Sequence, residues 1–409
     1  MSWVIHIGAG KWQNRAILKS VDMGYKVLSV DGDDSAIGFA VSNMTLVVDI
    51  RDIEKTKSSV LKIIKNQGLQ VVAVHCVANE AGQISASVIR EELNLSGLKL
   101  EQARALTNKV CQRELFNSQY LLTPNWVEVI SEHSISEIKT KIEKKIGEEN
   151  IIVKPADSSG SRGITVLRGY DLEQLKAAVE FALKASVSNK AIVEQYINGK
   201  EYTIESITID GVTHVLMVTK KHKVDGTDDT VARRLVSNNI GIKLIKNFEY
   251  AINSFCQSTS INDCIGHTEV IKDSEGRFWL VEMAGRGAGF GVFEKMLPVY
   301  SDYDVIEASL KIDLGMPVIV PAGISERFAG ISFLVSKKGK LIKLELDKSK
   351  LDIKDKSVWF EKFCKEGDML GEASTDGDRV GYVLAVADTL NELIQKLDET
   401  ERCIDYEVN

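Results

Sequence analysis

The sequence predicts a mixed fold, α/β and α+β, with an N-terminal doubly wound parallel sheet, a central α+β region and a C-terminal β-rich domain. Three observations support this prediction. Strand-like and helix-like segments alternate over residues 1–100, apolar runs joined by turns follow from residue 151, and β-rich patterns return after Pro317. Alternating strands and helices favour a parallel sheet, whereas short turns between apolar runs favour antiparallel hairpins.

Length and composition limit the class of protein. The chain has 409 residues, of which 44% are hydrophobic and 27% charged, and its net charge is −7. A chain this long is expected to form two or three domains, and the acidic balance gives no reason to expect nucleic acid as a partner. Six scattered cysteines without a CxxC pair indicate reduced thiols, and no signal peptide or membrane span is apparent. We therefore expect a cytoplasmic protein, without a membrane partner, that acts on something soluble.

The N-terminal region has a βαβ pattern. The expected strands are 3–7, 26–30, 44–48 and 69–77, and the expected helices are 12–23, 53–66 and 84–93. Gly8 and Gly10 follow the first strand and Asp31 ends the second, as in a dinucleotide-binding fingerprint. The third fingerprint position is Gln13 rather than Gly or Ala, so a tight strand-to-helix turn explains the glycines more simply.

The central region begins with expected helices at 100–118 and 137–145, followed by strands at 151–154 and 164–167. Between these strands lies a segment with a Gly/Ser-rich tip, residues 155–163, whose backbone N–H groups suit a phosphate. No GxxxxGK[ST] motif occurs, which excludes P-loop chemistry.

Further elements follow to the end of the chain. They are a helix at 171–185, strands at 191–197, 201–209 and 212–220, a polar loop at 221–235, helices at 235–258 and 301–314, a strand at 328–335 and a last helix at 389–399.

Two acidic residues thirteen positions apart, Glu269 and Glu282, lie in apolar runs joined by the turn 272–277. This pattern predicts an antiparallel hairpin that sets the two carboxylates side by side. Carboxylates held close repel unless a cation or a proton lies between them, and Mg²⁺ takes such oxygen ligands. Arg286 follows among glycines and suits a phosphate or a developing oxyanion. A surface hairpin with solvated charges is the alternative for this pattern alone.

The order of the polar positions resembles the ATP-grasp superfamily, and within it the carboxylate–amine ligase branch. That branch includes L-amino-acid ligases and relatives of biotin carboxylase and carbamoyl-phosphate synthetase. The resemblance implies an N-terminal α/β pre-ATP-grasp domain at 1–100, an ATP-grasp pair of α+β subdomains at 101–315 and a C-terminal β-rich domain at 316–409. The lid subdomain would lie at about 151–200.

The resemblance implies an ATP site. The expected nucleotide-binding residues are Lys109, Lys154, Ser158, Ser159, Gly160, Ser161, Gly163, Glu194, Gln195, Tyr196, Ile197, Glu201, Lys220 and Lys221. The first two lysines would neutralise the α- and β-phosphates, and the Gly/Ser loop would close over the β- and γ-phosphates. The strand from Glu194 would pair with the adenine edge, and Glu201 would accept hydrogen bonds from the ribose. Strand register decides which of Lys220 and Lys221 faces the nucleotide.

The resemblance also implies a metal site and a reaction centre. Glu269 and Glu282 would hold one or two Mg²⁺, with Mn²⁺ as an alternative ion. Arg286 would stabilise the transferring phosphoryl group and the tetrahedral species that follows, while His267 either caps the hairpin or faces the substrate. Many family members have Asn two residues after the second metal Glu. Here that residue is Ala284, which leaves the second ion open and argues against a close D-alanine–D-alanine ligase relative.

The implied activity is that of an ATP-dependent carboxylate–amine ligase, EC 6.3 type, which forms an acyl phosphate and then an amide or dipeptide. Its substrates would be a small carboxylate and an amine, with amino acids favoured, and a homodimer is in keeping with related enzymes. The substrate pocket would include Asn79 and Glu80, and Arg327 would bind a carboxylate or form a structural salt bridge. Two alternatives stay open, a bicarbonate-activating carboxylase and a non-catalytic nucleotide- or dinucleotide-binding protein.

Overall fold

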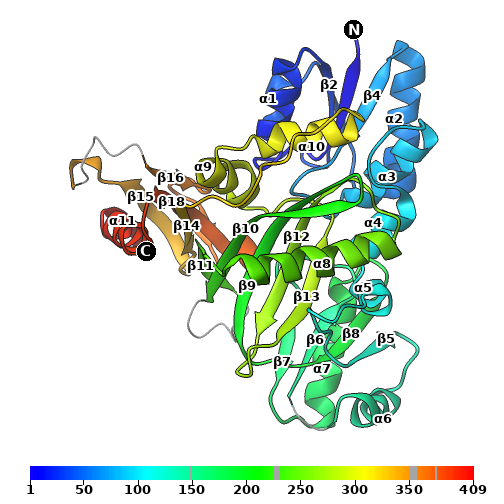
Figure 1. Ribbon diagram of the computed structural model, residues 1–409, viewed down its shortest axis with the longest axis vertical. Helices are drawn as coiled ribbons and strands as arrows, with labels where there is room; N and C mark the ends of the chain where they lie inside the picture. The colour runs from blue at the N-terminus through cyan, green and yellow to red at the C-terminus, as the bar shows by residue number, and fades with distance from the viewer. Residues whose placement is uncertain (148–149, 224–230, 351–356, 374) are drawn as a thin grey trace.

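The computed structural model describes residues 1–147, 150–223, 231–350, 357–373 and 375–409. The N-terminal region forms a parallel sheet at one end of the molecule (Figure 1). Its strand order is β3 (Met44–Val47), β2 (Lys26–Asp31), β1 (Trp3–Ile7), β4 (Val71–His75). The accompanying helices are α1 (Asn14–Asp22), α2 (Ile53–Gln67) and α3 (Gln83–Glu92). The predicted doubly wound parallel sheet is confirmed.

The glycines after β1 form a tight turn. Gly8 has a φ of +95°, in the region that favours glycine. The Asp31 carboxylate accepts a hydrogen bond of 2.6 Å from the Ala9 backbone N–H, and the Gln13 amide donates to Val77 O at 2.9 Å. Asp31 and Gln13 therefore stabilise a tight strand-to-helix turn, which is the explanation that the sequence favoured over dinucleotide binding.

A four-stranded antiparallel sheet at the other end of the molecule is called the lid sheet here (Figure 1). Its order is β5 (Trp126–Ile130), β8 (Lys190–Gln195), β6 (Ile151–Pro155), β7 (Thr165–Leu167). Helices α6 (Ile135–Lys145) and α7 (Leu172–Ala185) share an apolar core with it, and each begins with a side-chain cap, from Ser134 and Asp171. Strand β5 is absent from the sequence prediction.

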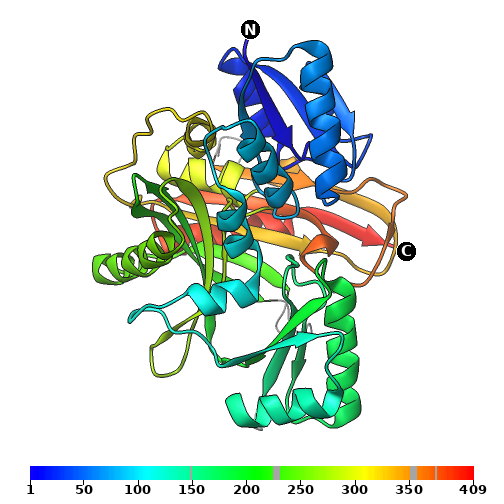
Figure 2. The ribbon, with the colours of Figure 1, turned by 90° about the vertical axis from the view of Figure 1, so that its right-hand side faces the viewer.

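An eight-stranded antiparallel sheet occupies the middle of the molecule (Figure 2). Its order is β13 (Phe278–Ala284), β12 (Cys264–Lys272), β9 (Lys200–Ile209), β10 (Val212–Lys223), β11 (Ala232–Ser237), β14 (Phe328–Val335), β18 (Arg379–Ala387), β16 (Val358–Lys362). A small third antiparallel sheet contains β17 (Met369–Leu370), β15 (Gly339–Leu346) and β19 (Ile404–Val408). The large sheet continues across residue 315, and the division into three domains stays a proposal.

Helices α8 (Ile242–Ser258), α10 (Val305–Asp313) and α11 (Leu390–Arg402) complete the packing around this sheet. The short helices α4 (Leu100–Thr107), α5 (Lys109–Leu115) and α9 (Leu297–Ser301) connect the larger elements. Among the described residues, no helix is long and apolar enough to cross a membrane.

Three expected elements were wrong in part. The helix expected at 100–118 is two helices, because the Asn108 side chain accepts from Val110 N and Cys111 N and so begins α5. The loop expected at 221–235 is strand at both ends, while residues 224–230 lie outside the described part of the chain. The helix expected from 235 begins at 242, because residues 235–237 belong to β11 between β10 and β14.

Candidate functional site

Strands β12 and β13 form the predicted hairpin. Glu269 and Glu282 are direct partners across it, and a register shift follows immediately after Glu269. The turn is held by Asp273, whose carboxylate accepts from the Arg277 backbone N–H at 2.9 Å and from the Trp279 ring N–H at 2.8 Å. The hairpin thus places two carboxylates side by side, as the sequence predicted.

These carboxylates face a cavity of about 420 Å³ that is also lined by residues of the lid sheet and the eight-stranded sheet. The predicted nucleotide-binding residues that line it are Lys109, Lys154, Ser158, Ser159, Gly160, Ser161, Glu194, Gln195, Tyr196, Ile197, Glu201 and Lys221. Apolar side chains of Ile152, Val166, Ile271 and Leu280 complete its wall. The predicted residues Gly163, Lys220, His267 and Arg286 are not among those that line it.

Strand register answers the open question about the lysine pair. The Lys221 ammonium lies 2.8 Å from Glu269 Oε2 and 3.3 Å from Glu201 Oε2. Lys223, two residues on, also lines the cavity and pairs with Glu201. Because alternate side chains of a strand face the same side, the position of Lys221 would have identified Lys223, which the sequence prediction missed.

Lys109 contacts the second hairpin carboxylate. Its ammonium lies 3.0 Å from Glu282 Oε1 and donates to Ser158 O at 2.8 Å, with only 3% of the side chain exposed. Burial is the main cause that raises the pKa of Glu282; Lys109 opposes the rise, and the neighbouring Glu80 and Glu269 add to it. Glu282 therefore lies where additional positive charge is stabilising.

Two carboxylates and the nearby cations fit a magnesium–nucleotide complex, because Mg²⁺ needs few protein ligands when phosphates and waters supply the others. Within the described ranges, no group of three or more His, Cys, Asp or Glu side chains could hold a metal ion. Ala284 occupies the position where the family resemblance would place a metal-binding Asn. It is buried and pairs with His267 across the hairpin. Glu269 and Glu282 are the residues that could hold such an ion.

Glu194 is the centre of a buried ion-pair group. Its side chain is 0% exposed, with Arg113 Nε 2.6 Å from Oε1 and Lys154 Nζ 2.7 Å from Oε2. Burial alone would raise the pKa of Glu194, but Arg113 and Lys154 lower it to about 2. The sequence did not identify Arg113, because its contact with Glu194 joins positions 81 residues apart.

Replacing Glu194 with Gln should destabilise the fold strongly. Removing the carboxylate leaves Arg113 and Lys154 buried without their partner, which typically costs about 3–5 kcal/mol. The depressed pKa adds a pH dependence. The carboxylate's stabilisation is present above its unfolded pKa of about 4.3 and is lost as pH falls towards 2, on the order of 3 kcal/mol. Urea unfolding between pH 2.5 and 7 should show a steeper loss of stability towards low pH in wild type than in the variant, which keeps only the contributions of the other carboxylates.

The matched control is Glu128→Gln on the adjacent strand β5. Glu128 pairs with Lys190 at 2.8 Å, but the two side chains are 35% and 44% exposed. Exposed pairs contribute about 0–1 kcal/mol, so this variant should unfold almost as wild type does. Equal losses in both variants would contradict the importance assigned to the buried group.

The Gly/Ser-rich tip is a constrained turn. Gly160, Ser161 and Gly163 have φ values of +68°, +62° and +72°. A Cβ at Gly163 would lie 2.5 Å from Ala185 Cβ and 2.8 Å from Pro155 Cγ, which no side-chain rotation relieves. Gly163 therefore holds the base of the loop against the lid sheet rather than lining the cavity.

Replacing Gly163 with Ala should lower the free energy of unfolding by more than backbone strain alone would. We expect about 1–2 kcal/mol from the left-handed backbone and a further ~1–3 kcal/mol from the overlap with Ala185 and Pro155. Gly169→Ala is the control, since Gly169 has a φ of +63° but open space around its Cβ position. Urea unfolding of both variants checks the prediction, and equal losses would contradict it.

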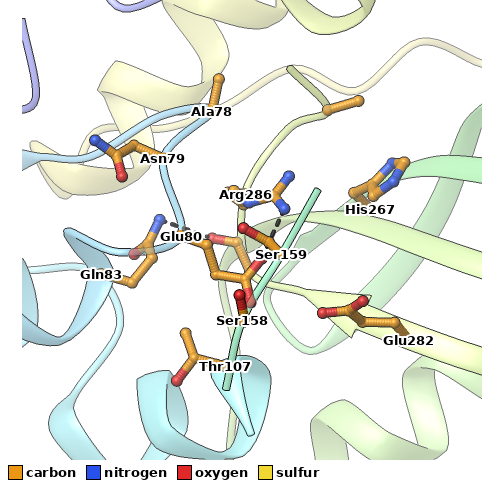
Figure 3. Close-up of polar contacts among 12 residues, drawn as sticks. Ala78, Asn79, Glu80, Gln83, Thr107, Ser158, Ser159, His267, Glu282 and Arg286 are labelled. Carbon is orange, nitrogen blue, oxygen red and sulfur yellow. Dashed lines mark hydrogen bonds and ion pairs between the residues drawn. The ribbon is translucent and has the colours of Figure 1, made fainter. Parts of the chain in front are cut away.

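Next to the hairpin lies a second group of charges, centred on Arg286 and His267 (Figure 3). Arg286 Nη2 lies 2.7 Å from Glu80 Oε2, and His267 Nδ1 lies 2.5 Å from Glu205 Oε1. Burial lowers the pKa of His267, but Glu205 and Glu269 outweigh it and raise the pKa to about 9. His267 is thus protonated at neutral pH and links the hairpin to β9.

The sequence prediction did not include Glu205, which lies opposite His267 across β9 and β12. The sequence carried no clear signal for it, because the same strand also contains Glu201 and several hydroxyl residues. Arg327 pairs with Asp302, so the structural salt bridge is the arrangement observed.

Part of the chain is similar in sequence to known proteins. Residues 147–294 match the family described as the ATP-grasp domain. A D-alanine–D-alanine ligase from Magnetococcus marinus is 27% identical over 241 residues, covering 55% of this chain and 73% of that protein. A D-alanine–D-alanine ligase from Francisella tularensis subsp. novicida is 22% identical, covering 68% of this chain and 86% of that protein.

Solved structures match almost the whole chain. An L-amino acid ligase from Bacillus licheniformis has a TM-score of 0.84 at 17% identity, covering 100% of this chain and 99% of that one. A phosphoribosylglycinamide synthetase from Anaerococcus prevotii has a TM-score of 0.75 at 15% identity, covering 100% of both chains. These similarities confirm the fold class predicted from the sequence.

Proposed function

We propose that this chain, an ATP-grasp protein of the carboxylate–amine ligase branch, is an ATP-dependent ligase that joins a small carboxylate to an amine. One observation carries the proposal. Glu269 and Glu282 are paired across a hairpin at a cavity that also contains Lys109, Lys154 and Lys221. Two carboxylates beside several ammonium groups suit a metal-bound polyphosphate.

Different parts of the cavity wall suit different parts of a nucleotide. The lysines would contact the phosphates, the apolar wall around Ile152 and Leu280 suits a purine base, and Glu201 suits the ribose hydroxyls. Glu269 and Glu282 would hold Mg²⁺, which supplies charge neutralisation on the phosphates when it is bound. The same carboxylates pair with Lys221 and Lys109, so these lysines would exchange partners when a nucleotide binds.

The reaction has two stages. The substrate carboxylate oxygen bonds to the γ-phosphorus of ATP as the bond to ADP breaks, which gives an acyl phosphate. The amine then attacks the acyl carbon and phosphate leaves, with Arg286 placed to offset negative charge on the tetrahedral species. Glu80, beside Arg286, offers a carboxylate for an ammonium group. Relatives named as D-alanine–D-alanine ligase and L-amino acid ligase support amino acids as substrates.

The test is ADP and phosphate release with pools of L- and D-amino acids, with Mg²⁺, with Mn²⁺ and without metal. We expect release that requires both metal and amino acids, together with a condensed product seen by mass spectrometry. Release that requires bicarbonate but no amine would favour the carboxylase alternative instead. A cytoplasmic location and a homodimer are further proposals, the latter tested by sedimentation.

A further inference from the structure

A second, smaller cavity of about 30 Å³ lies beside Arg286 and away from the residues expected to bind ATP. It is lined by His75 at the end of β4, Arg90 of α3, and Ser309 and Asp313 of α10. The cavity therefore lies where the N-terminal sheet meets the central region. Nothing in the proposed reaction uses these residues.

Asp313 of α10 holds the two basic residues on the N-terminal side of this cavity. Asp313 Oδ2 lies 2.7 Å from His75 Nδ1, and Asp313 Oδ1 lies 3.1 Å from Arg90 Nη2. Arg90 Nε also donates to Val74 O at 2.8 Å. His75, Arg90 and Asp313 are all buried, and Gly97 packs so closely that an added Cβ would lie 2.4 Å from Asp313 Oδ1.

Three buried nitrogen atoms of the lining residues have no hydrogen-bond partner among the described residues. They are Arg286 Nε, Arg90 Nη1 and His75 Nε2. Arg286 is otherwise satisfied, since Nη2 contacts Glu80 and Nη1 donates to Gly287 O at 3.1 Å. Buried polar atoms of charged groups nearly always find a partner, and an ordered water supplies it where protein atoms do not.

We propose that this cavity holds one ordered water, which accepts hydrogen bonds from Arg286 Nε and Arg90 Nη1 and donates one to His75 Nε2. The volume is sufficient, because a single water needs about 10–15 Å³. The donors and acceptors also match. In the tautomer whose Nδ1–H donates to the Asp313 carboxylate, His75 Nε2 is an acceptor, and a water offers it a hydrogen and offers the two arginines its two lone pairs.

The water makes His75, Arg90 and Asp313 positioning residues for Arg286. The guanidinium group is then held from two sides, by Glu80 and by the water, and both contacts come from the N-terminal region. A cation whose position is fixed before reaction stabilises developing charge without reorganisation. This consequence rests on the proposed role of Arg286. The presence of the water does not depend on that role.

The test compares two substitutions of one residue. In His75→Asn the amide nitrogen can replace Nδ1 and keep the contact with Asp313, but no atom reaches the position of Nε2. In His75→Gln the longer side chain places an oxygen near that position. We expect His75→Asn to lower kcat about tenfold with little change in the KM for ATP, and His75→Gln to restore most of the loss. Ser309→Ala, in the same cavity wall, should behave as wild type.

A crystal structure of the wild-type protein at a resolution that shows waters gives a readout independent of activity. We expect density for one water within hydrogen-bonding distance of the three nitrogens, and its loss in His75→Asn. An empty cavity, direct contact between Arg286 and His75, or an anomalous signal there after a bromide soak would overturn the proposal. If the water is present but the protein shows no ligase activity, only the proposed function is contradicted.

Discussion

Replacing Glu282 with Ala is expected to lower kcat for phosphate release by about 10³-fold, because the hairpin loses one of two carboxylates that fit Mg²⁺. Glu282 is also the partner of Lys109, at 3.0 Å, so the ammonium loses its position as well. The measurement is ADP-coupled phosphate release at saturating ATP and Mg²⁺, together with the Mg²⁺ dependence of ADP binding. The binding readout should weaken even where turnover is too slow to measure.

The control for this prediction lies in the same hairpin. Glu275, in the turn between β12 and β13, is largely exposed and contacts Arg277. Glu275→Ala should therefore keep wild-type turnover and Mg²⁺ dependence. Near-normal turnover in Glu282→Ala, with unfolding unchanged, would show that the metal assignment is wrong.

The hairpin was predictable because its signal is local. Glu269 and Glu282 interrupt apolar runs that flank a polar turn, and residues joined by a short turn have few other partners. The same holds for the parallel N-terminal sheet, whose strands and helices follow each other in the chain. The lysine that faces the cavity was not predictable, because one residue of register decides between Lys220 and Lys221.

The buried charge partners depend on distant parts of the chain. Arg113 reads as an ordinary helical residue until α5 packs against the lid sheet, where Glu194 is its partner. Glu205 likewise has its partner, His267, 62 residues away in the sequence. Both partners come from elements whose packing no local pattern describes. This is why the sequence identified one member of each pair and missed the other.

Replacing Arg286 with Met should separate binding from chemistry. Arg286 lies outside the set of residues that line the large cavity, so ATP affinity should change little. We expect kcat to fall about 10²–10³-fold, the usual loss when one group that stabilises a developing oxyanion is removed. The variant should also be less stable by about 3 kcal/mol, because the buried Glu80 carboxylate loses its cation.

A double variant distinguishes the chemical role of Arg286 from its structural one. Adding Glu80→Gln to Arg286→Met removes the unpaired carboxylate, so urea unfolding should show that most of the lost stability returns. Turnover should stay low and below that of the single variant Glu80→Gln, because no cation is restored at the position of the guanidinium. If turnover returned together with stability, the loss in Arg286→Met would come from the buried charge on Glu80, and Arg286 would be a structural partner rather than a group that acts on the reacting atoms.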